Sequence, residues 1–434
     1  MKRIYARAAR PSPRLGLTCG LMIVINSAAI AQELKGEIEY GYWGNAARAD
    51  VTEKVSRLFE QQNPGTKVTG VSAEYNAFIE RLTVQSAASE LPCVTQMQST
   101  FLASYANRGA LLSLDELVQS GKIDLKGIPP EILDTGKVDG KQYMIPTGTF
   151  LRLLAFNKTL ATEHGIEPPP DHATFADYEA WLRAAQKKLP KGVYAAENEA
   201  PIPFSLYSWV SGHGETMFKD GQIAASPATI AAWFRFWNDL ANDGVAIPPD
   251  RLDEELANLE LTPFANGHTL VATRDIPHIA IMEKVRASQG VPTEMAFVSN
   301  PANDKAVSGN VPGTNGLTIA ANCNNVPLAA AYINFFGGDP AAAIAFQSSN
   351  GVVVSATGRD ALLKDANTPP SVRRSLESLD KVTNANDIAT ANYPSGYQGM
   401  AAVLRRQYEE VAFNGTSPED AAQAFIDEVN SLLN

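Results

Sequence analysis

The chain has 434 residues, of which 45% are hydrophobic and 19% charged, and its formal net charge is −11. A chain of this length exceeds the size at which a single hydrophobic core keeps growing, so we expect two domains. An acidic chain without a block of lysines and arginines argues against binding to nucleic acid or to an anionic membrane surface.

The first 31 residues have the pattern of an export signal. Five basic residues lie within residues 2–14, an apolar stretch covers residues 15–25, and residues 29–31 read Ala-Ile-Ala, an A-x-A cleavage site. The apolar stretch is short for a membrane span, so we interpret the segment as a cleavable secretory signal peptide. A lipoprotein would need Cys19 as its anchor, but Cys19 lies inside the apolar run. We therefore expect a periplasmic protein that starts at Gln32, has a net charge of −16, and does not insert into the membrane.

The next part of the chain alternates strand and helix patterns. Apolar residues recur at helical spacing from Ala47 to Phe59, and the stop signal Asn63-Pro64-Gly65 follows. The predicted elements in chain order are strand 36–42, this helix, strand 66–72, helix 75–89 and strand 92–98. Strands that alternate with helices predict a parallel sheet covered on both faces.

The middle of the chain continues in the same style. Residues 168–170 are three prolines that indicate a stiff loop before a helix starting near Thr174. A helix predicted at 228–243 carries an aromatic stripe, which we interpret as core rather than as a ligand platform because helical periodicity explains it. A buried helix is predicted at 327–336.

Motifs of catalysis and metal binding are missing from the sequence. The five histidines never occur at HxH or HxxxH spacing, and there is no GxSxG elbow and no P-loop. We therefore expect no catalytic residue, no metal and no cofactor, although a pair of carboxylates facing each other across a cleft would leave no mark in the sequence. Once Cys19 is removed, Cys93 and Cys323 allow either one disulfide or two buried thiols.

Polar and aromatic residues gather where the predicted strands end. Trp43 follows the first strand, Gln98, Ser99 and Thr100 follow the third, and Tyr75 begins the second helix. Ligands of open α/β sheets bind outside the carboxyl ends of the strands. An exposed aromatic ring there can stack on a sugar, while amides and hydroxyls bond to its hydroxyl groups. The alternative for Trp43 is a packing role as a lid over the first helix.

Five segments, in this order, resemble the extracellular solute-binding proteins of ABC importers, the group that includes maltose-binding protein. They are "YWGN" with "LFEQQNPGTKV", "ELPCVTQMQSTFLASYANRGALLSLDELV", "VDGKQYMIPTGTFLRLLAFNKTLATEHGIEPPPDHATFADYEAWLRAAQKK", "FANGHTLVAT" and "GTNGLTIAANCNNVPLAAAYINFF". The resemblance covers essentially the whole chain after the signal peptide.

The resemblance implies an α/β fold of the two-lobed periplasmic binding protein type (type II, maltose-binding-protein-like), with a hinge and an interlobe cleft. It places the N-terminal lobe at 32–150 and 313–368 and the C-terminal lobe at 151–312 and 369–434. The first crossover between lobes should fall near 148–155. In this family the lobes close around the ligand, and the membrane permease recognises the closed form.

The resemblance also implies a disulfide. In the sheet order of this family the strand that returns after residue 313 lies antiparallel to the third strand, so that Cys93 and Cys323 should meet at the edge away from the cleft. A departure from the family is Gln98, which stands where an acidic residue often follows the third strand. This departure weakens the expectation of a plain neutral oligosaccharide bound through an aspartate.

The ligand contacts implied by the resemblance come from both lobes. From the first lobe we expect Trp43, Asn45, Tyr75, Gln98 and Ser99, and from the second Tyr207, Trp209, His213, Thr273, Arg274, Asp275, Tyr393 and Tyr397. Arg48, Arg152 and Arg274 lie near predicted cleft edges and carry the planar fork that suits anionic groups. For Arg48 the alternative is an ion pair with a nearby acid such as Asp50.

The predicted function is that of a carbohydrate receptor of an ABC importer, a monomer and not an enzyme. The ligand would be a mono- or oligosaccharide or a sugar derivative. If two of the three arginines face the cleft, the ligand is instead an anionic sugar such as a uronic acid, a sulfosugar or a sugar phosphate. A secreted carbohydrate-active enzyme is the remote alternative.

Overall fold

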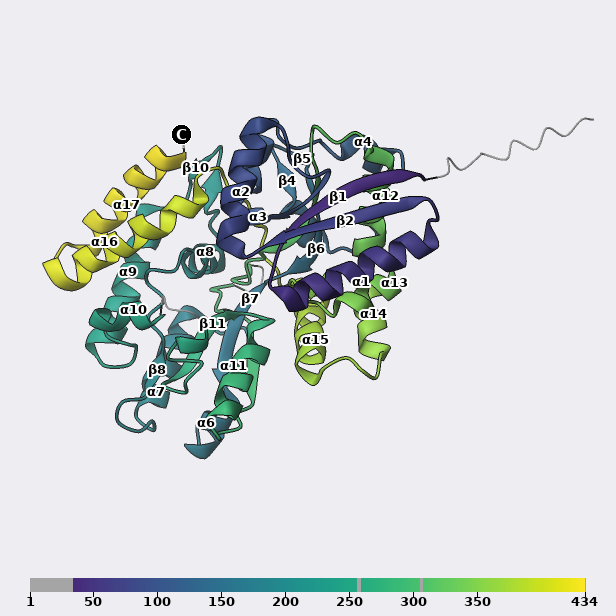
Figure 1. The fold of residues 1–434 in the computed structure, drawn as a ribbon. Coiled ribbons are helices and arrows are strands. Elements are labelled where there is room, and N and C mark those ends of the chain that lie inside the picture. The colour runs from purple at the N-terminus through teal and green to yellow at the C-terminus, as the bar shows by residue number, and fades with distance from the viewer. Residues whose placement is uncertain (1–33, 256–258, 305–306, 434) are drawn as a thin grey trace, which may run out of the picture. The chain divides into compact units, whose positions relative to one another are not determined.

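The computed structural model describes residues 34–255, 259–304 and 307–433. The predicted signal peptide lies outside these residues. Within them the chain builds two main β-sheets from strands that alternate with helices (Figure 1). The mixed α/β pattern of the sequence is therefore confirmed.

The first sheet contains six strands in the order β14-β6-β13-β3-β1-β2. β1 pairs in parallel with β2 and β3, as the alternating pattern predicts. β13 is antiparallel to both β3 and β6, and β14 is antiparallel to β6, so that only one half of the sheet is parallel. The strands are β1 (Gly36–Trp43), β2 (Thr66–Ala73), β3 (Val94–Gln98), β6 (Met144–Thr149), β13 (Thr314–Ile319) and β14 (Val352–Val353).

Helices cover both faces of this sheet. On one face Val55 and Phe59 of α1 pack with Tyr332 of α12 against β1. On the other face Phe78 of α2 and Phe101 of α3 pack beneath the strand tip. These helices are α1 (Ala46–Gln62), α2 (Tyr75–Ala88), α3 (Ser99–Ala106), α12 (Val326–Gly338) and α13 (Pro340–Phe346).

The second sheet contains four strands in the order β12-β7-β11-β8. β7 is antiparallel to β11 and β12, and β8 is parallel to β11. The strands are β7 (Arg152–Asn157), β8 (Tyr194–Ala196), β11 (Thr269–Asp275) and β12 (Met295–Val298).

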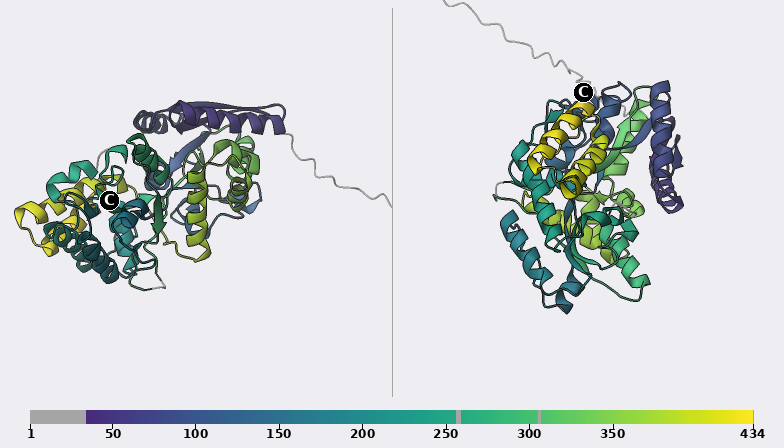
Figure 2. Two further views of the ribbon diagram at one scale, coloured as in Figure 1. Left: turned by 90° about the horizontal axis from the view of Figure 1, so that it is seen from below. Right: turned by 90° about the vertical axis from the view of Figure 1, so that its left-hand side faces the viewer.

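A large aromatic core lies on one side of the second sheet, and α11 (His278–Ser288) packs against the other. The predicted aromatic stripe on α9 is part of this core, because Trp233 and Trp237 are buried in it. Two C-terminal helices, α16 and α17, lie side by side and complete the core (Figures 1 and 2). The helices on this side are α6 (Lys158–Glu163), α7 (Phe175–Gln186), α8 (Pro203–Gly212), α9 (Pro227–Asn242), α16 (Met400–Asn414) and α17 (Pro418–Leu433).

Local sequence signals explain where helices begin and end. α1 ends at Gln62, and the next residues are the predicted Asn-Pro-Gly stop. Thr174 caps α7 through a reciprocal capping box with Asp177. The remaining short elements are α4 (Asp115–Gln119), α5 (Pro130–Asp134), β4 (Lys137–Val138), β5 (Lys141–Gln142), β9 (Phe218–Lys219), β10 (Gln222–Ile223) and α10 (Leu252–Glu255).

The chain first passes from one sheet to the other at Phe150 and Leu151, inside the predicted 148–155 window. An apolar cluster at this crossing contains Leu151 and Leu153, together with Val352 at β14. It is completed by α14 (Ala356–Lys364) and α15 (Pro370–Asn384). This cluster joins elements of both sheets; the lobe boundaries themselves remain a prediction.

Cys93 and Cys323 form a disulfide with their Cα atoms 4.5 Å apart. The bond lies just beyond the cross-strand pair of Val94 and Ile319. The opposite end of the same two strands pairs Gln98 with Asn315. The disulfide implied by the resemblance is therefore present, at the far end of β3 and β13 from the predicted cleft.

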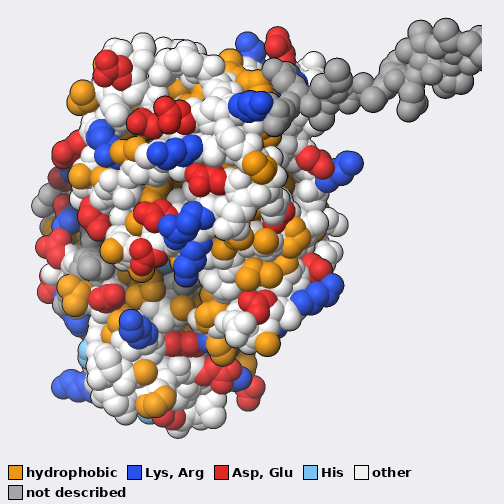
Figure 3. Space-filling view, turned by 45° about the vertical axis from the view of Figure 1, so that its right-hand side comes forward, with side chains coloured by type: hydrophobic (Ala, Val, Ile, Leu, Met, Phe, Trp, Pro, Cys, Tyr) orange, Lys and Arg blue, Asp and Glu red, His pale blue; other side chains and the backbone are white. Residues whose placement is uncertain are grey.

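Acidic and basic side chains are interspersed over the face drawn in Figure 3. Within the described part of the chain, no helix combines the length and the apolar character that a membrane crossing requires. The same residues contain no cluster of three or more histidine, cysteine or acidic side chains able to hold a metal ion.

Candidate ligand-binding site

Strand ends of both sheets meet at one cavity of about 370 Å³. Gln98 ends β3, Asn315 lies opposite it on β13, Asp275 ends β11, and Phe150 stands at the crossing between the sheets. Sites for small molecules typically measure about 300–1,000 Å³, so the cavity can hold a sugar-sized ligand. Its other walls are Arg48, Pro277, His278, Ala280, Ile281, Ser348, Ser349, Asn350, Gly351, Val352, Ser371, Val372 and Ser375.

Among the described residues, one carboxylate lines this cavity, and it is held by two neighbours. Oδ1 of Asp275 lies 2.7 Å from Nε of Arg152, and Oδ2 lies 3.4 Å from Nε2 of His278. Burial lowers the pKa of His278, which favours the neutral imidazole. The Arg152 guanidinium also lies 5.2 Å from the centre of the Phe204 ring. Asp275 is therefore charge-compensated by Arg152, and its position at the cavity wall is fixed.

Arg48 brings a positive charge to the opposite wall. Its guanidinium donates to the backbone oxygens of Trp43 (3.3 Å) and Ser349 (2.7 Å). Among the described residues no carboxylate forms an ion pair with it, so the expected alternative of a pair with Asp50 is not seen. Burial lowers the pKa of Arg48, and the charges of Tyr40 and Glu74 nearby offset this effect only in part.

A chain of hydrogen bonds lies at the carboxyl end of β3 in the first sheet. The hydroxyls of Tyr75 and Thr100 both donate to Oε1 of Gln98, at 3.3 and 3.1 Å. Nε2 of Gln398 donates to the Thr100 hydroxyl at 2.9 Å. This last bond connects the start of α3 to the 3-10 turn Tyr397–Gly399. That turn leads into α16, which packs in the aromatic core beside the second sheet.

The structure corrects the expectation that Trp43 is an exposed sugar platform. Trp43 is only 7% exposed and packs against Tyr75 and Phe78, with ring centres 5.6 and 5.5 Å away. Successive strand residues point to opposite faces, so Trp43 faces α2 and α3 while Tyr42 faces α1. It is therefore not a lid over α1 either. The exposed ring at this edge is Tyr75, which is 41% exposed.

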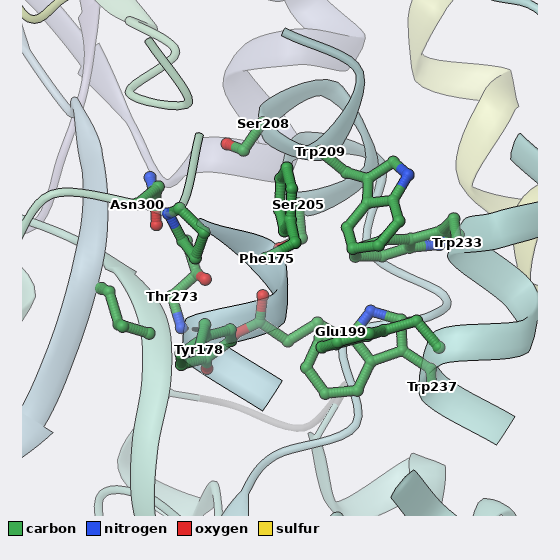
Figure 4. A pocket seen from close by; sticks show the side chains of 13 residues that line it. Phe175, Tyr178, Glu199, Ser205, Ser208, Trp209, Trp233, Trp237, Thr273 and Asn300 are labelled. Carbon is green, nitrogen blue, oxygen red and sulfur yellow. Dashed lines mark hydrogen bonds between the residues drawn. The ribbon is translucent and has the colours of Figure 1, made fainter. Parts of the chain in front are cut away.

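Trp209 and Thr273 line a different cavity, inside the core of the second sheet (Figure 4). This cavity measures about 30 Å³, close to the volume that one water molecule occupies. The carboxylate of Glu199 reaches into it and accepts a hydrogen bond from the backbone nitrogen of Thr273. The ring of His213 stacks on Phe175 with centres 4.4 Å apart. Trp209 and Thr273 therefore lie at a water-sized space, and His213 packs beside it. None of the three residues lines the 370 Å³ cavity.

Several other predicted contacts are committed to internal bonds. Arg274 is 5% exposed and forms a buried ion pair with Glu197, because it points away from the cavity that Asp275 faces. The Ser99 hydroxyl accepts from the backbone of Thr314 at 3.1 Å. Asn45 is exposed and caps α1 by accepting from the backbone of Arg48.

Three predicted tyrosines are also buried. The Tyr207 hydroxyl bonds to the backbone of Asn392, and burial raises the pKa of Tyr207 to about 12. The Tyr393 hydroxyl donates to the oxygen of Pro312 at 2.7 Å. The Tyr397 hydroxyl is buried without a hydrogen-bond partner in the described structure. None of these three tyrosines lines the 370 Å³ cavity.

Another cavity, of about 740 Å³, lies among residues 171–174, 300–304, 307–308 and 385–388. No residue of the first sheet lines it. It therefore lacks the convergence of strand ends that defines the 370 Å³ cavity.

One whole wall of the 370 Å³ cavity was not predicted from the sequence. His278 and Ser371 belong to the first turns of α11 and α15, and Asn315 stands at the start of β13. Proline precedes or begins both helices, at Pro277 and at 369–370, which is a recognisable helix-start signal. The local signal was present, but the sequence does not show that both helices start at the same place.

Residues 40–343 match the family model described as "Bacterial extracellular solute-binding protein". The chain belongs to this family. The family consists of solute-binding proteins, and the chain has their two-lobed α/β fold, as its structural neighbours also indicate.

Individual relatives are distant. A protein of Brucella abortus (strain 2308), named only as a candidate binding protein, is 24% identical over 298 residues. The match covers 68% of this chain and 65% of that protein, which is less than two thirds of its length.

The solved structures that are similar in fold include the following two. A periplasmic oligogalacturonide-binding protein from Yersinia enterocolitica has a TM-score of 0.75 at 18% identity, covering 92% of this chain and 99% of its own. The sugar-binding protein MalE from Xanthomonas citri has a TM-score of 0.73 at 20% identity, covering 92% and 97%.

Proposed function

We propose that the protein is the carbohydrate-binding receptor of an ABC importer, located in the periplasm and delivering its ligand to a membrane permease. The observation that carries this proposal is the 370 Å³ cavity at which strand ends of both sheets meet. Family membership supports the receptor role, and two fold neighbours whose names state that they bind sugars support the class of ligand.

The lining of the cavity suits a sugar. Gln98, Asn315 and Asn350 provide amide groups that can both donate to and accept from hydroxyls. Phe150 provides an apolar ring on which the C–H face of a sugar can pack. The cavity is also lined by Asp275 at the end of β11 in the second sheet, so a ligand that contacts Asp275 as well as these residues favours the closed arrangement.

The same lining disfavours the alternative of a hydrolase. Glycoside hydrolysis generally requires two carboxyl groups placed on either side of the bond to be cleaved. Among the described residues that line the cavity, Asp275 is the one carboxylate, and it is paired with Arg152. A receptor needs no second carboxylate.

A thermal-shift screen followed by calorimetry tests the proposal. Purified mature protein is scanned against mono- and oligosaccharides, polyols and sugar acids, since a ligand of the folded form raises the melting temperature by an amount that grows with the logarithm of its concentration relative to Kd. We expect at least one saccharide to raise the melting temperature, and Gln98→Ala and Asn315→Ala to weaken its binding. Gln423→Ala is the control, because Gln423 is exposed on α17 and bonds only to Asp427. A screen without any saccharide hit, or equal weakening by the control, would contradict the assignment.

Light scattering and turnover assays complete the test. We expect a monomer in solution and no release of product from the saccharide that binds. Cleavage of that saccharide, abolished by Asp275→Asn, would instead favour the enzyme.

A further inference from the structure

The charge balance of the 370 Å³ cavity points to one kind of ligand. Among the lining residues that the structure describes, the titratable side chains are Arg48, Asp275 and His278. Asp275 is balanced by Arg152 directly behind it, at 2.7 Å. Arg48 has only backbone oxygens as partners in the described structure. One positive charge at the cavity wall thus has no ion-pair partner among the described residues, although Glu74 acts on it from further away.

The position of Arg48 is built into the local sequence. The side chain folds back from α1 across Gly44 toward the end of β1. A Cβ atom on Gly44 would lie 2.5 Å from Cδ of Arg48, so that any larger residue there would displace the arginine. The bond from Arg48 to Ser349, 301 positions away along the chain, fixes the guanidinium from the other side.

Two helices begin at the same cavity without an acidic residue in their first turns, although the carboxylate of Asp275 lies 3.4 Å from the His278 ring at the start of α11. α11 has 11 residues and α15 has 15, and neither has an acidic residue in its first turn or a side-chain cap. His278, Ala280, Ser371 and Val372 of these first turns line the cavity. The first backbone N–H groups of a helix have no partner within the helix and carry partial positive charge, which favours anions.

Asn315 gives independent evidence that the cavity is built for a ligand. Asn315 is 7% exposed and lines the cavity. Its Nδ2 donates to the backbone and side-chain oxygens of Asn350, which fixes the orientation of the amide. Its Oδ1 is buried and has no partner in the described structure. A buried acceptor of this kind is normally satisfied, and a ligand hydroxyl would satisfy it.

We propose that the receptor binds a sugar that carries an anionic group, with the anion held by Arg48 and the first turns of α11 and α15, and a neighbouring hydroxyl held by Asn315. This inference rests on the proposed carbohydrate receptor and names its class of substrate. Of the three arginines considered from the sequence, Arg48 lines the cavity and the other two do not. The N-terminal N–H groups of α11 and α15 supply the second source of positive charge.

Matched pairs of sugars test the inference by calorimetry on the full mature protein. The pairs are glucose with glucuronate and galactose with galacturonate, and glucose 6-phosphate and glucose 6-sulfate distinguish the type of anion. We expect at least one anionic member to bind about 10- to 100-fold more tightly than its neutral partner, as charge-assisted hydrogen bonds allow. That advantage should shrink as salt is added.

Two substitutions locate the anion. Arg48→Gln should remove most of the advantage of the acid, whereas Arg57→Gln on the exposed face of the same helix should leave it unchanged. Ser371→Asp places a carboxylate in the first turn of α15, where it stabilises the helix and occupies the place of the ligand anion. It should therefore keep or raise the melting temperature while it lowers affinity for the acid and spares the neutral partner.

The outcomes separate this inference from the proposed function. If neutral saccharides bind and no anionic member binds more tightly than its partner, the anionic inference is overturned and the receptor proposal stands. If Ser371→Asp leaves acid binding intact in a folded protein, the assignment of the anion to this cavity is overturned. If no saccharide of either kind binds, the carbohydrate receptor itself is refuted.

Discussion

Removal of the disulfide between Cys93 and Cys323 should strongly lower stability without affecting ligand binding. The two residues are separated by 230 positions. In the chain-entropy model, closing a loop of this length restricts the unfolded chain by about 5 kcal/mol at 25 °C. Native disulfides typically contribute about 2–4 kcal/mol, because the unfolded state retains structure. We therefore expect Cys93→Ala/Cys323→Ala to lower the free energy of unfolding by about 2–5 kcal/mol.

Urea unfolding monitored by circular dichroism measures this loss, with the reduced wild-type protein as a second comparison that keeps both side chains. The slope of unfolding against urea should rise as well, because an unfolded chain without the cross-link is more expanded. The bond lies at the end of β3 and β13 remote from Gln98 and Asn315, so the dissociation constant for the ligand should change less than about twofold. A stability loss below about 1 kcal/mol would refute the loop-entropy argument, and a large loss of affinity in the folded variant would refute the separation of the two ends of the sheet.

The remaining predictions concern packing, closure and pH. Trp43→Ala should lower the free energy of unfolding by about 3–5 kcal/mol because Trp43 is buried, whereas Tyr75→Ala should cost less than about 1.5 kcal/mol; equal losses in urea unfolding would contradict this contrast. Gln398→Ala removes the bond to Thr100, so the ligand-free protein should show a larger radius of gyration in small-angle scattering, and an unchanged radius would mean that this bond does not restrain opening. Burial lowers the pKa of His278, so on acidification through about pH 6.5 the unfolded chain takes up the proton first and stability falls. His278→Gln should weaken the dependence of the urea midpoint on pH between about 7 and 5; an identical dependence would contradict the assignment.

The individual elements could be predicted from the sequence because their signals are local. Apolar residues at helical spacing and the Asn63-Pro64-Gly65 stop define α1 to within one or two residues. Thr174 and Asp177 stand three positions apart, which is the spacing of a capping box. The fold followed from the order of such segments and their resemblance to a family. The site depends on contacts between segments that are far apart in the sequence. Of the predicted contact residues, Arg48, Gln98 and Asp275 line the cavity and the others do not.

The alternation of side chains along a strand explains why two predicted ligand contacts, Trp43 and Arg274, do not line the cavity. Trp43 and Arg274 each stand next to a residue that faces the other way, Tyr42 and Asp275 respectively. The sequence places such a residue at a strand end but leaves open which face of the sheet it meets. Gln98, which was predicted as a ligand contact, does line the cavity, because a residue at the carboxyl end of a strand lies at the rim on either face; its contact with a ligand stays a prediction. Prediction of binding residues in such folds is therefore more secure for the strand end than for the face.

The position of α15 links ligand binding to the crossing between the sheets. Its first turn, at Ser371 and Val372, lines the cavity. One to two turns further on, Leu376 and Leu379 are fully buried in the apolar cluster that also contains Leu151 at the crossing. A helix is stiff over this distance, so a ligand that holds the first turn also restrains this cluster at the crossing. An anion at the start of α15 would thus act on the crossing between the two sheets as well as on the cavity.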